Sequence, residues 1–338
     1  MFPTVTALMA TKVGLEEVRL AATRLSGNLH RTEVITCSTL DSMSGNQLFF
    51  KTEMFQKTGS FKARGALNAI KCCLERGSSP PMIVTHSSGN HGQAVAWAAR
   101  HCQLPCTVVV PEGTPTVKCE AIKGYGARLV MCHPSPTGRK EMADKIAKET
   151  GGKIIHPYDD YDVIAGQGTI GLELIEQVAD LDVVLVPISG GGMTSGIATA
   201  VKSIRPECKV IAVEPEGKDL WRSLKNRERM WPNPPQFLNT IAEGIMTQQV
   251  GQVTFPLLCD LVDGVITVND KEMSEGCRLA AERMKVMVEA ASGAAIAAAL
   301  SDKMKEMAEG GKKVGVILCG GNVDMMKLPW LDQRVVNK

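Results

Sequence analysis

One lysine of this chain lies at a turn between glycines, directly before a segment with the apolar spacing of a helix. This is Lys62, in the stretch Thr58-Gly-Ser-Phe-Lys-Ala-Arg-Gly-Ala66. A lysine amine held at such a position can bond covalently to the carbonyl carbon of a cofactor. Its position alone favours a solvated surface lysine instead, because the chain has 38 Lys and Arg and most such residues only keep a protein soluble. The choice depends on the other motifs.

A glycine loop follows the apolar run 183–188. Ser189-Gly190-Gly191-Gly192-Met193 precedes a helical pattern over 194–204. Backbone N–H groups of such a loop converge on an anion, and the helix dipole favours negative charge there. No Lys and Ser/Thr of a triphosphate site follows, so the loop predicts a site for the monophosphate of a cofactor. The alternative is a tight turn that needs small residues.

Two other motifs also follow predicted strands. Ser87-Ser88-Gly89-Asn90-His91-Gly92-Gln93 comes after the run 82–85, and its hydroxyls, amide and free N–H groups suit a carboxylate. Either serine could equally be a helix cap. Cys319-Gly-Gly-Asn322 follows the strand 314–318, where open α/β sheets bind ligands. The common alternative for a single cysteine is a buried, inert thiol.

A further glycine motif matches the dinucleotide-binding fingerprint letter for letter. Taken alone, it would indicate a nicotinamide dehydrogenase. Gly166-Gln-Gly-Thr-Ile-Gly171 has the required spacing. The fingerprint needs a strand that runs straight into the glycines and an acidic residue about 20 positions later. The sequence has neither, so glycines that let helices pack closely are the better interpretation.

Short β-branched runs alternate with longer helical patterns, which predicts an α/β fold of parallel sheets with helices on both faces. We expect a large domain of residues 1–81 and 157–338 and a small, mobile substrate-binding domain of residues 82–156. The predicted strands are 48–51, 82–85, 107–110, 128–131, 154–156, 183–188, 210–214, 265–268 and 314–318. The predicted helices are 61–74, 91–101, 141–149, 168–178, 194–204, 272–288 and 294–307.

Composition excludes several classes of protein. A net charge of +2 and 4% aromatic residues provide neither the basic surface nor the stacking side chains that bind nucleic acid. No apolar run is long enough for a membrane span, and Met1 to Val13 lacks the basic and apolar parts of a secretion signal. The eleven cysteines are an odd number without metal-ligand spacing. Reduced thiols and a cytoplasmic location are therefore expected, and zinc is not.

The four motifs at Lys62, Ser88, Gly190 and Cys319, in this order and spacing, resemble those of the fold-type II pyridoxal-phosphate enzymes. Within them the chain is most similar to the serine racemase and serine/threonine dehydratase family, from about Leu15 to Asn322. The resemblance implies a two-lobed fold like that of the tryptophan synthase β chain. It also implies pyridoxal 5'-phosphate as cofactor, a small amino acid as substrate and a homodimer.

The resemblance also implies a role for each matching residue. Lys62 would carry the cofactor as a Schiff base and move the α-proton on one face, and Ser88 would donate a proton on the other. The cofactor would be held by Phe61, Lys62, Asn90, Gly190, Gly191, Gly192, Met193 and Cys319. The substrate would be held by Ser87, Ser88, Gly89, Asn90, His91, Arg139 and Thr247.

Two regulatory sites are implied more weakly. The positions that bind an ATP activator in serine racemase correspond to Ser38, Lys57, Thr58, Tyr125, Lys285 and Asn322. Glu214 matches an acidic ligand of a Mg²⁺ or Ca²⁺ loop, whereas the second acid, Asp219, arrives one position early. Two surface acids are the alternative.

We therefore expect a racemase of serine that also eliminates water from serine or threonine to form a 2-oxo acid and ammonia. The alternatives are a dehydratase of serine, threonine or 3-hydroxyaspartate with little racemisation, and an aspartate racemase. The acidic residues of 157–160 offer no cation for a second carboxylate, which disfavours aspartate. A silent amino-acid or nucleotide sensor is the alternative outside catalysis, and the presence of both Lys62 and Ser88 argues against it.

Overall fold

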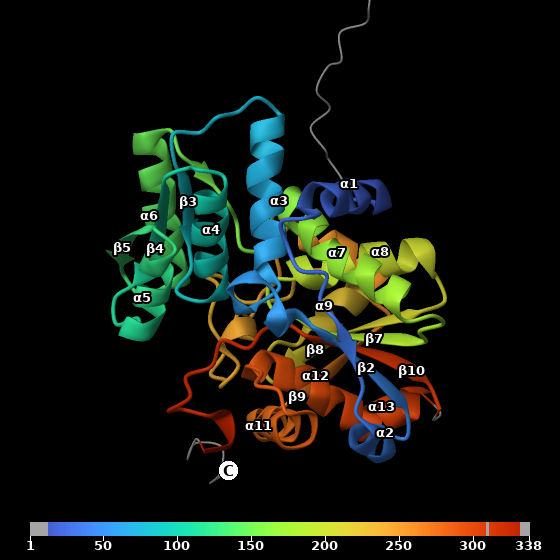
Figure 1. The fold of residues 1–338 in the computed structure, drawn as a ribbon. Helices are drawn as coiled ribbons and strands as arrows, with labels where there is room; N and C mark the ends of the chain where they lie inside the picture. Colours follow the sequence, from blue (N-terminus) through green and yellow to red (C-terminus); the bar gives the residue numbers. More distant parts are fainter. Residues whose placement is uncertain (1–12, 309–310, 332–338) are drawn as a thin grey trace, which may run out of the picture.

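The computed structural model describes residues 13–308 and 311–331, which form two sheets surrounded by helices (Figure 1). The segment Met1 to Val13, which was compared with a secretion signal, lies outside these residues except for Val13. The larger sheet has six strands, and all neighbouring pairs are parallel except β1 with β2. In spatial order they are β1 (Val34–Ile35), β2 (Gln47–Thr52), β10 (Lys313–Leu318), β7 (Val183–Pro187), β8 (Lys209–Pro215) and β9 (Gly264–Val268).

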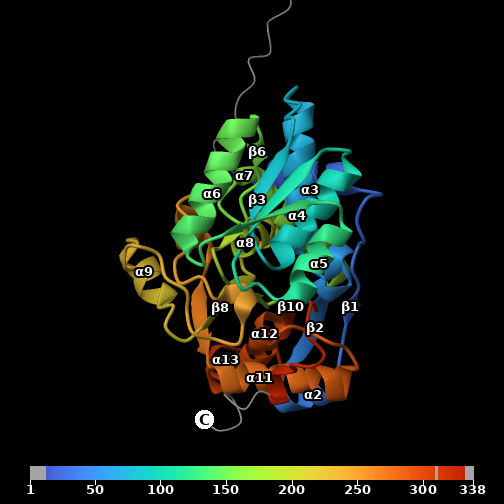
Figure 2. The same ribbon diagram turned by 90° about the vertical axis from the view of Figure 1, so that its left-hand side faces the viewer.

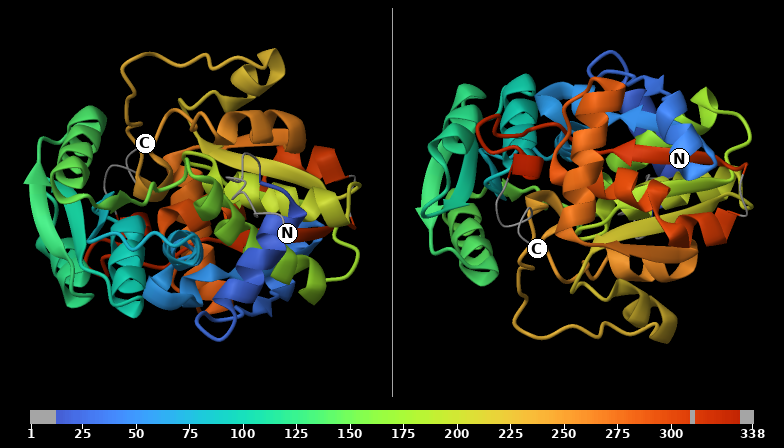
Figure 3. Two further views of the ribbon diagram at one scale, coloured as in Figure 1. Left: turned by 90° about the horizontal axis from the view of Figure 1, so that it is seen from above. Right: turned by 90° about the horizontal axis from the view of Figure 1, so that it is seen from below.

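The smaller sheet has four parallel strands, and all of them come from the segment predicted to form the small domain. In spatial order they are β5 (Arg128–Cys132), β4 (Cys106–Pro111), β3 (Ile83–His86) and β6 (Lys153–Ile154). Helices α4 (Asn90–His101), α5 (Thr116–Gly124) and α6 (Pro136–Thr150) pack against it. Figures 2 and 3 show this group at one side of the molecule, next to the larger sheet.

Helices cover both faces of the larger sheet, as Figure 1 shows. Helix α12 (Ala290–Leu300) packs against strands β7 to β10, while α8 (Gly192–Ile204) packs on β7 and β8 from the opposite side. Every residue of β7 is buried, because a strand covered on both faces must be apolar throughout. Helices α3 (Lys62–Glu75), α7 (Tyr161–Gln177) and α1 (Leu15–Leu25) complete the layer around α8.

All nine predicted strands are present, but two predicted helices are wrong in part. The helix expected over 272–288 is α11 (Asp270–Leu279) followed by a π-helical turn (Ala280–Met284), and it stops at Lys285 with a φ of 61°. The helix expected over 294–307 is interrupted at Ser301, whose hydroxyl accepts a hydrogen bond from Met304 N at the start of α13 (Asp302–Ala308). Ser301 thus separates α12 from α13, because its hydroxyl caps the start of α13.

Several short elements were not predicted. They are α1, α5 and β1, together with α2 (Ser38–Ser44), α9 (Leu220–Asn226) and α10 (Thr254–Leu261). Most are short or mixed in polarity, so their periodicity is weak, and their packing against the rest of the chain is what stabilises them.

The dinucleotide-like glycines lie in the middle of α7, so the helix-packing interpretation is confirmed. A Cβ added at Gly166 would lie 2.7 Å from Gly65 Cα of α3, and one added at Gly168 would lie 2.9 Å from Gly196 O of α8. The motif therefore lets α7 cross two helices at very short range.

All eleven cysteines have free thiols, as expected from their spacing. Among the residues that the structure describes, no helix has the length and apolar character needed to cross a membrane.

Candidate functional site

The turn before α3 is tied to the end of β10, and this brings Lys62 close to Cys319. Phe61 N donates to Cys319 O at 3.0 Å, and Ser60 forms a β-bridge with Gly320. The carboxyl ends of β3, β7 and β10 carry the other three motifs, at Ser87, Ser189 and Cys319. Strand order and parallel direction thus gather residues that lie more than 250 positions apart in the sequence.

The Lys62 amine is partly buried and has no carboxylate partner at ion-pair distance among the described residues. Its Nζ donates to Pro157 O at 2.6 Å and lies 5.0 Å from the centre of the Phe61 ring. Burial lowers the pKa of Lys62 to about 8, while the negative charge of Glu289 acts in the opposite direction. A large share of this amine is therefore neutral, and nucleophilic, near pH 8.

The glycine loop has the geometry of a phosphate cradle. Gly191 has a φ of 97°, which only glycine adopts easily, and Gly192 begins α8. Gly190 O accepts hydrogen bonds from Thr254 Oγ1 at 2.7 Å and from Gly251 N at 2.9 Å. The first N–H groups of α8 are left for an anion, so the loop fits the monophosphate of pyridoxal phosphate.

Tyr158 packs directly on this loop. The ring atoms of Tyr158 lie within 2.4 Å of where a Gly190 Cβ would be, so the glycine makes room for the phenol. His156 accepts a hydrogen bond from Asp159 N at 2.9 Å, and its ring lies edge-on to Tyr158 and to His86. Burial lowers the pKa of His86 and of His156 to about 4 each, so both imidazoles are neutral at pH 7.

Asn90 belongs to a cluster of polar side chains beside Cys319. Asn90 Nδ2 donates to both carboxylate oxygens of Glu289, at 3.0 and 2.9 Å, while Asn90 Oδ1 accepts from Asn322 Nδ2 at 2.8 Å. Cys319 Sγ lies 3.7 Å from Glu289 Oε1 and 3.5 Å from Ser292 Oγ. Burial, and next the charge of Glu289, raise the pKa of Cys319 well above its ordinary value, so this group is a neutral thiol.

The serine loop after β3 and the start of α4 place the side chains of Ser87, Ser88 and His91 in three different environments. Ser87 Oγ accepts from Gly89 N at 3.2 Å, whereas the hydroxyl of Ser88 makes no hydrogen bond within the described part of the chain. The His91 ring instead points into the small sheet, where Nε2 lies 3.1 Å from Ile155 O. Nε2 is therefore committed to the fold, whereas Nδ1 is buried without a hydrogen-bond partner in the described structure, and the backbone N–H of His91 remains for a substrate carboxylate.

Phe237 brings two of the predicted substrate residues together. The Arg139 guanidinium lies 5.0 Å from the Phe237 ring centre, and Phe237 also forms a β-bridge with Thr247. Arg139 Nε is buried without a hydrogen-bond partner in the described structure. An unpaired guanidinium of this kind suits an anionic substrate group.

Of the residues predicted to bind a nucleotide, Thr58 and Asn322 are in contact with each other. Asn322 Nδ2 donates to Thr58 O at 2.8 Å, next to Lys57 and in contact with Asn90. No hydrogen bond among residues 13–308 and 311–331 joins Ser38, Tyr125 or Lys285 to this pair, and the Lys285 amine bonds to Glu282 O.

The predicted metal ligands do not fit a divalent ion. Glu214 Oε2 accepts from Leu220 N at 3.0 Å and Oε1 accepts from Thr267 Oγ1 at 3.0 Å, so both oxygens are in use. The Asp219 side chain is 61% exposed and faces Arg222. Across the described ranges, no three His, Cys, Asp or Glu side chains lie close enough together to hold a metal. The pairing of Glu214 with Asp219 as a metal site stays a prediction, which this geometry does not favour.

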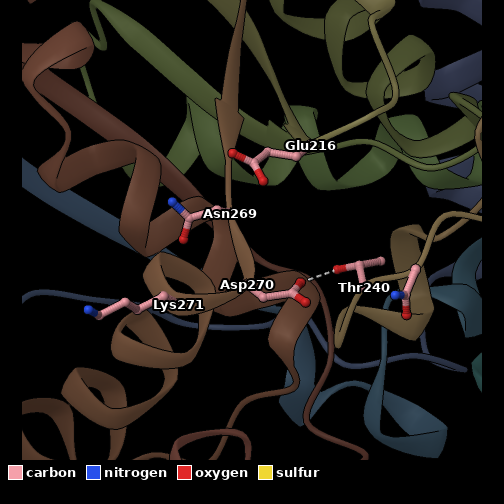
Figure 4. Close-up of a pocket in the computed structure, with 6 residues that line it drawn as sticks. Glu216, Thr240, Asn269, Asp270 and Lys271 are labelled. Atoms are coloured by element: carbon pink, nitrogen blue, oxygen red, sulfur yellow. Dashed lines mark hydrogen bonds between the residues drawn. The ribbon is translucent and has the colours of Figure 1, made fainter. Parts of the chain in front are cut away.

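A polar pocket of about 260 Å³ lies near this loop and away from Lys62 (Figure 4). Asp270 accepts from Thr240 Oγ1 at 2.6 Å in its wall. None of the predicted cofactor or substrate residues lines it; its lining is Glu216, Asn239, Thr240, Asn269, Asp270 and Lys271.

Comparison with known proteins agrees with this geometry. The model of the family described as "Pyridoxal-phosphate dependent enzyme" matches residues 25–320. The chain belongs to this family. The serine racemase of Dictyostelium discoideum is 44% identical over 321 residues, which are 95% of this chain and 98% of that protein.

Solved structures of this family extend the likeness to three dimensions. A pyridoxal 5'-phosphate-dependent aspartate racemase is 52% identical, with a TM-score of 0.92 over 94% of this chain and 98% of that one. The threonine deaminase of T.th. is 38% identical, with a TM-score of 0.84 over 92% of this chain and 99% of that one. The expected family and the fold-type II α/β architecture are thus confirmed. The role of each site residue stays a prediction.

The sequence alone missed four members of the site. Tyr158 and His156 lie in a polar stretch whose only visible signal was its acidic residues, and His86 ends a strand directly before Ser87. Glu289 lies between the predicted helices 272–288 and 294–307 and stands just before α12, where a carboxylate beside an alanine-rich run was the available signal.

Proposed function

We propose that this protein is a pyridoxal-phosphate-dependent racemase that interconverts L- and D-serine and also eliminates water from serine or threonine. The observation that carries the proposal is the Lys62 amine, whose pKa burial lowers to about 8, next to a neutral Cys319 thiol at the end of β10. Bound pyridoxal phosphate would withdraw electrons from the α-carbon of an amino acid and so make its α-proton removable.

The residues of this chain would divide the work. Gly190, Gly191, Gly192 and the backbone of Met193 would hold the phosphate, and Asn90 would meet the ring oxygen. Lys62 takes the α-proton on one face, and the unbonded hydroxyl of Ser88 returns a proton on the other. Because Cys319 is neutral, it does not hold the ring nitrogen in its protonated form as a carboxylate would. Reprotonation and elimination then both remain open to the substrate.

Aspartate racemisation is the second candidate, and two observations favour it more than the sequence did. The aspartate racemase structure has a higher identity than the serine racemases compared with this chain. The carboxylate of Asp159 accepts from Val253 N at 2.8 Å and that of Asp160 from Asp162 N at 2.8 Å. These acids cap α10 and α7, where the helix N-termini offset part of their charge, and Arg139 would be the cation for a second substrate carboxylate.

Chiral chromatography of the products from L-serine, L-threonine and L-aspartate tests the proposal. We expect D-serine and pyruvate from L-serine with the wild type, and neither with Lys62→Ala, while the matched variant Lys71→Ala on the same helix stays active. D-aspartate as the main product would replace serine by the second candidate. A wild type that binds no pyridoxal phosphate would overturn both.

Ser88→Ala separates the two reactions. We expect loss of D-serine formation with pyruvate formation from L-serine largely retained, because only reprotonation needs a donor on the second face. Ser79→Ala, in the exposed loop before β3, is the control. An equal loss of both products with Ser88→Ala would assign Ser88 a structural role instead.

Four finer properties belong to the same proposal. Residues 82–156 would move as a substrate-binding lobe, and ATP would bind around Thr58 and Asn322, whose contact with Asn90 links it to the cofactor. The protein would be a cytoplasmic homodimer, a location that its eleven free thiols favour. Light scattering with and without ATP, together with titration of ATP against the Asn322→Ala variant, tests the dimer and the nucleotide site.

A further inference from the structure

The loop after β8 contains a buried lysine between the two acids that were expected to bind a metal. We infer that the amino group of Lys218 takes the place of a divalent cation in this loop, so that the protein is held together there without Mg²⁺ or Ca²⁺. The inference goes beyond the proposed reaction, because it concerns how the phosphate loop is supported and not which amino acid reacts.

Lys218 sits in a cage of oxygen atoms. Its side chain is 0% exposed, and Nζ donates to Thr247 O at 2.6 Å and to Gln248 O at 2.9 Å. Backbone carbonyl oxygens are the hard ligands that Ca²⁺ and Mg²⁺ prefer, and an amino group satisfies the same atoms by donating hydrogen bonds. A buried lysine without such acceptors would be costly, so the cage and the lysine require each other.

The acid expected as first metal ligand faces the same lysine. Glu214 is 2% exposed, and its charge acts on Lys218. Its two oxygens are already engaged by Leu220 N and Thr267 Oγ1, which fixes the carboxylate without any ion. Asp219 adopts a φ of 54° and points outward, so the loop presents one acid and one amine where a metal loop needs two acids.

This contact supports the phosphate cradle. Trp231 Nε1 donates to Lys218 O at 2.6 Å, and Gln248 Nε2 donates to Gly217 O at 3.2 Å, so the loop and the segment 247–248 are bonded in both directions. Three residues further on, Gly251 N donates to Gly190 O at 2.9 Å. Lys218 is thus a positioning residue that acts on the cofactor site through the segment 247–251.

The experiment measures the melting temperature of the holoenzyme and the affinity for pyridoxal phosphate by absorbance, neither of which depends on the substrate. The variants are Lys218→Ala, Lys218→Met and the matched control Lys225→Ala, an exposed lysine of α9. Each protein is measured in EDTA, MgCl2, CaCl2 and ethylammonium chloride.

We expect the wild type and Lys225→Ala to give the same values in all four conditions. Lys218→Ala should melt roughly 3–6 °C lower, because two buried carbonyl groups lose their donor. It should also bind the cofactor about fivefold to tenfold more weakly. Ethylammonium, Mg²⁺ or Ca²⁺ should restore part of the loss by filling the vacated cage. Lys218→Met, which keeps the apolar stem and fills that space, should show the loss without rescue.

Three results would overturn the inference. The first is a wild type whose melting temperature rises with Mg²⁺ or Ca²⁺ and no longer does so in Glu214→Gln, because a metal would then bind this loop. The second is a Lys218→Ala variant that behaves like Lys225→Ala. The third is a destabilised Lys218→Ala variant that none of the three cations restores.

Discussion

Glu173 and Glu289 are both partly buried carboxylates, and their surroundings differ. Glu173 bonds to the Arg64 guanidinium at 2.6 Å and to the Lys51 amine at 2.6 Å. Arg64 also pairs with Glu53 at 2.8 Å, so the charges beneath α3 alternate in sign. Glu289 bonds only to the amide of Asn90 and to the thiol of Cys319, and no cation lies at ion-pair distance from it in the described structure.

The pKa values of the two carboxyls follow this difference. Burial acts on Glu173 in the upward direction, but Arg64 and Lys51 outweigh it and lower its pKa. Burial raises the pKa of Glu289, and the hydrogen bonds of Asn90 and Cys319 only reduce that effect. The network below Lys62 is therefore charge-compensated and serves the fold, whereas the site beside it keeps groups whose protonation is open to change.

Breaking the compensated network should have the largest effect on stability. Arg64→Met leaves Glu53 and Glu173 without their shared cation, and we expect a loss of about 3–5 kcal/mol in the free energy of unfolding. Urea unfolding of the cofactor-free protein measures it. Arg278→Met breaks ion pairs of α11 that are exposed to water and should cost far less, because water screens these charges. Equal costs would show that burial does not distinguish the two networks.

Replacement of Lys62 should have an intermediate effect on stability, and the size of this effect should depend on pH. Its folded-state pKa of about 8 lies below the ordinary value of 10.5, so the cost of burying the ammonium is complete below pH 8 and disappears between about pH 8 and 10.5. Lys62→Met should therefore stabilise the cofactor-free protein by about 1–2 kcal/mol at pH 7, with allowance for partial exposure, and by much less at pH 10. A gain that does not change with pH would contradict this.

The same shift predicts the pH dependence of cofactor capture. The rate at which the cofactor-free protein binds pyridoxal phosphate covalently should rise with a midpoint near pH 8, because only the neutral Lys62 amine attacks a carbonyl. Stopped-flow absorbance measures the rate. A midpoint near the ordinary lysine value of 10.5 would show that Lys62 is not perturbed.

Glu289 should have the smallest effect on stability. Its pKa is raised, so the cost of its charge is absent at low pH and appears as pH rises through that pKa. Glu289→Gln should stabilise the protein by less than about 1 kcal/mol at pH 7 and by nothing at pH 4, while it keeps the contact with Asn90. Thermal melts at both pH values measure it, and a loss of stability at pH 7 would place Glu289 with the compensated network.

Secondary-structure elements could be predicted from the sequence more completely than contacts between side chains. The strands were predictable because continuous apolar runs have few alternatives, and the four motifs were predictable because glycines, hydroxyls and a lysine at strand ends have distinct chemistry. The break at Ser301 was not, because a single capping hydroxyl decides it. The contact of the His91 ring with Ile155 O could not be predicted either, because the two residues lie 64 positions apart.

By itself the sequence determined the α/β architecture, the family and the order of the motifs that surround Lys62, because each depends on local patterns of residue type. Only the tertiary structure decided which groups share an environment. Glu289 reaches Asn90 across 199 positions, and Lys218 meets the carbonyls of Thr247 and Gln248 at 29 and 30 positions. Such contacts set burial and charge, and these lower the pKa of Lys62 to about 8 and that of Lys218 to about 7.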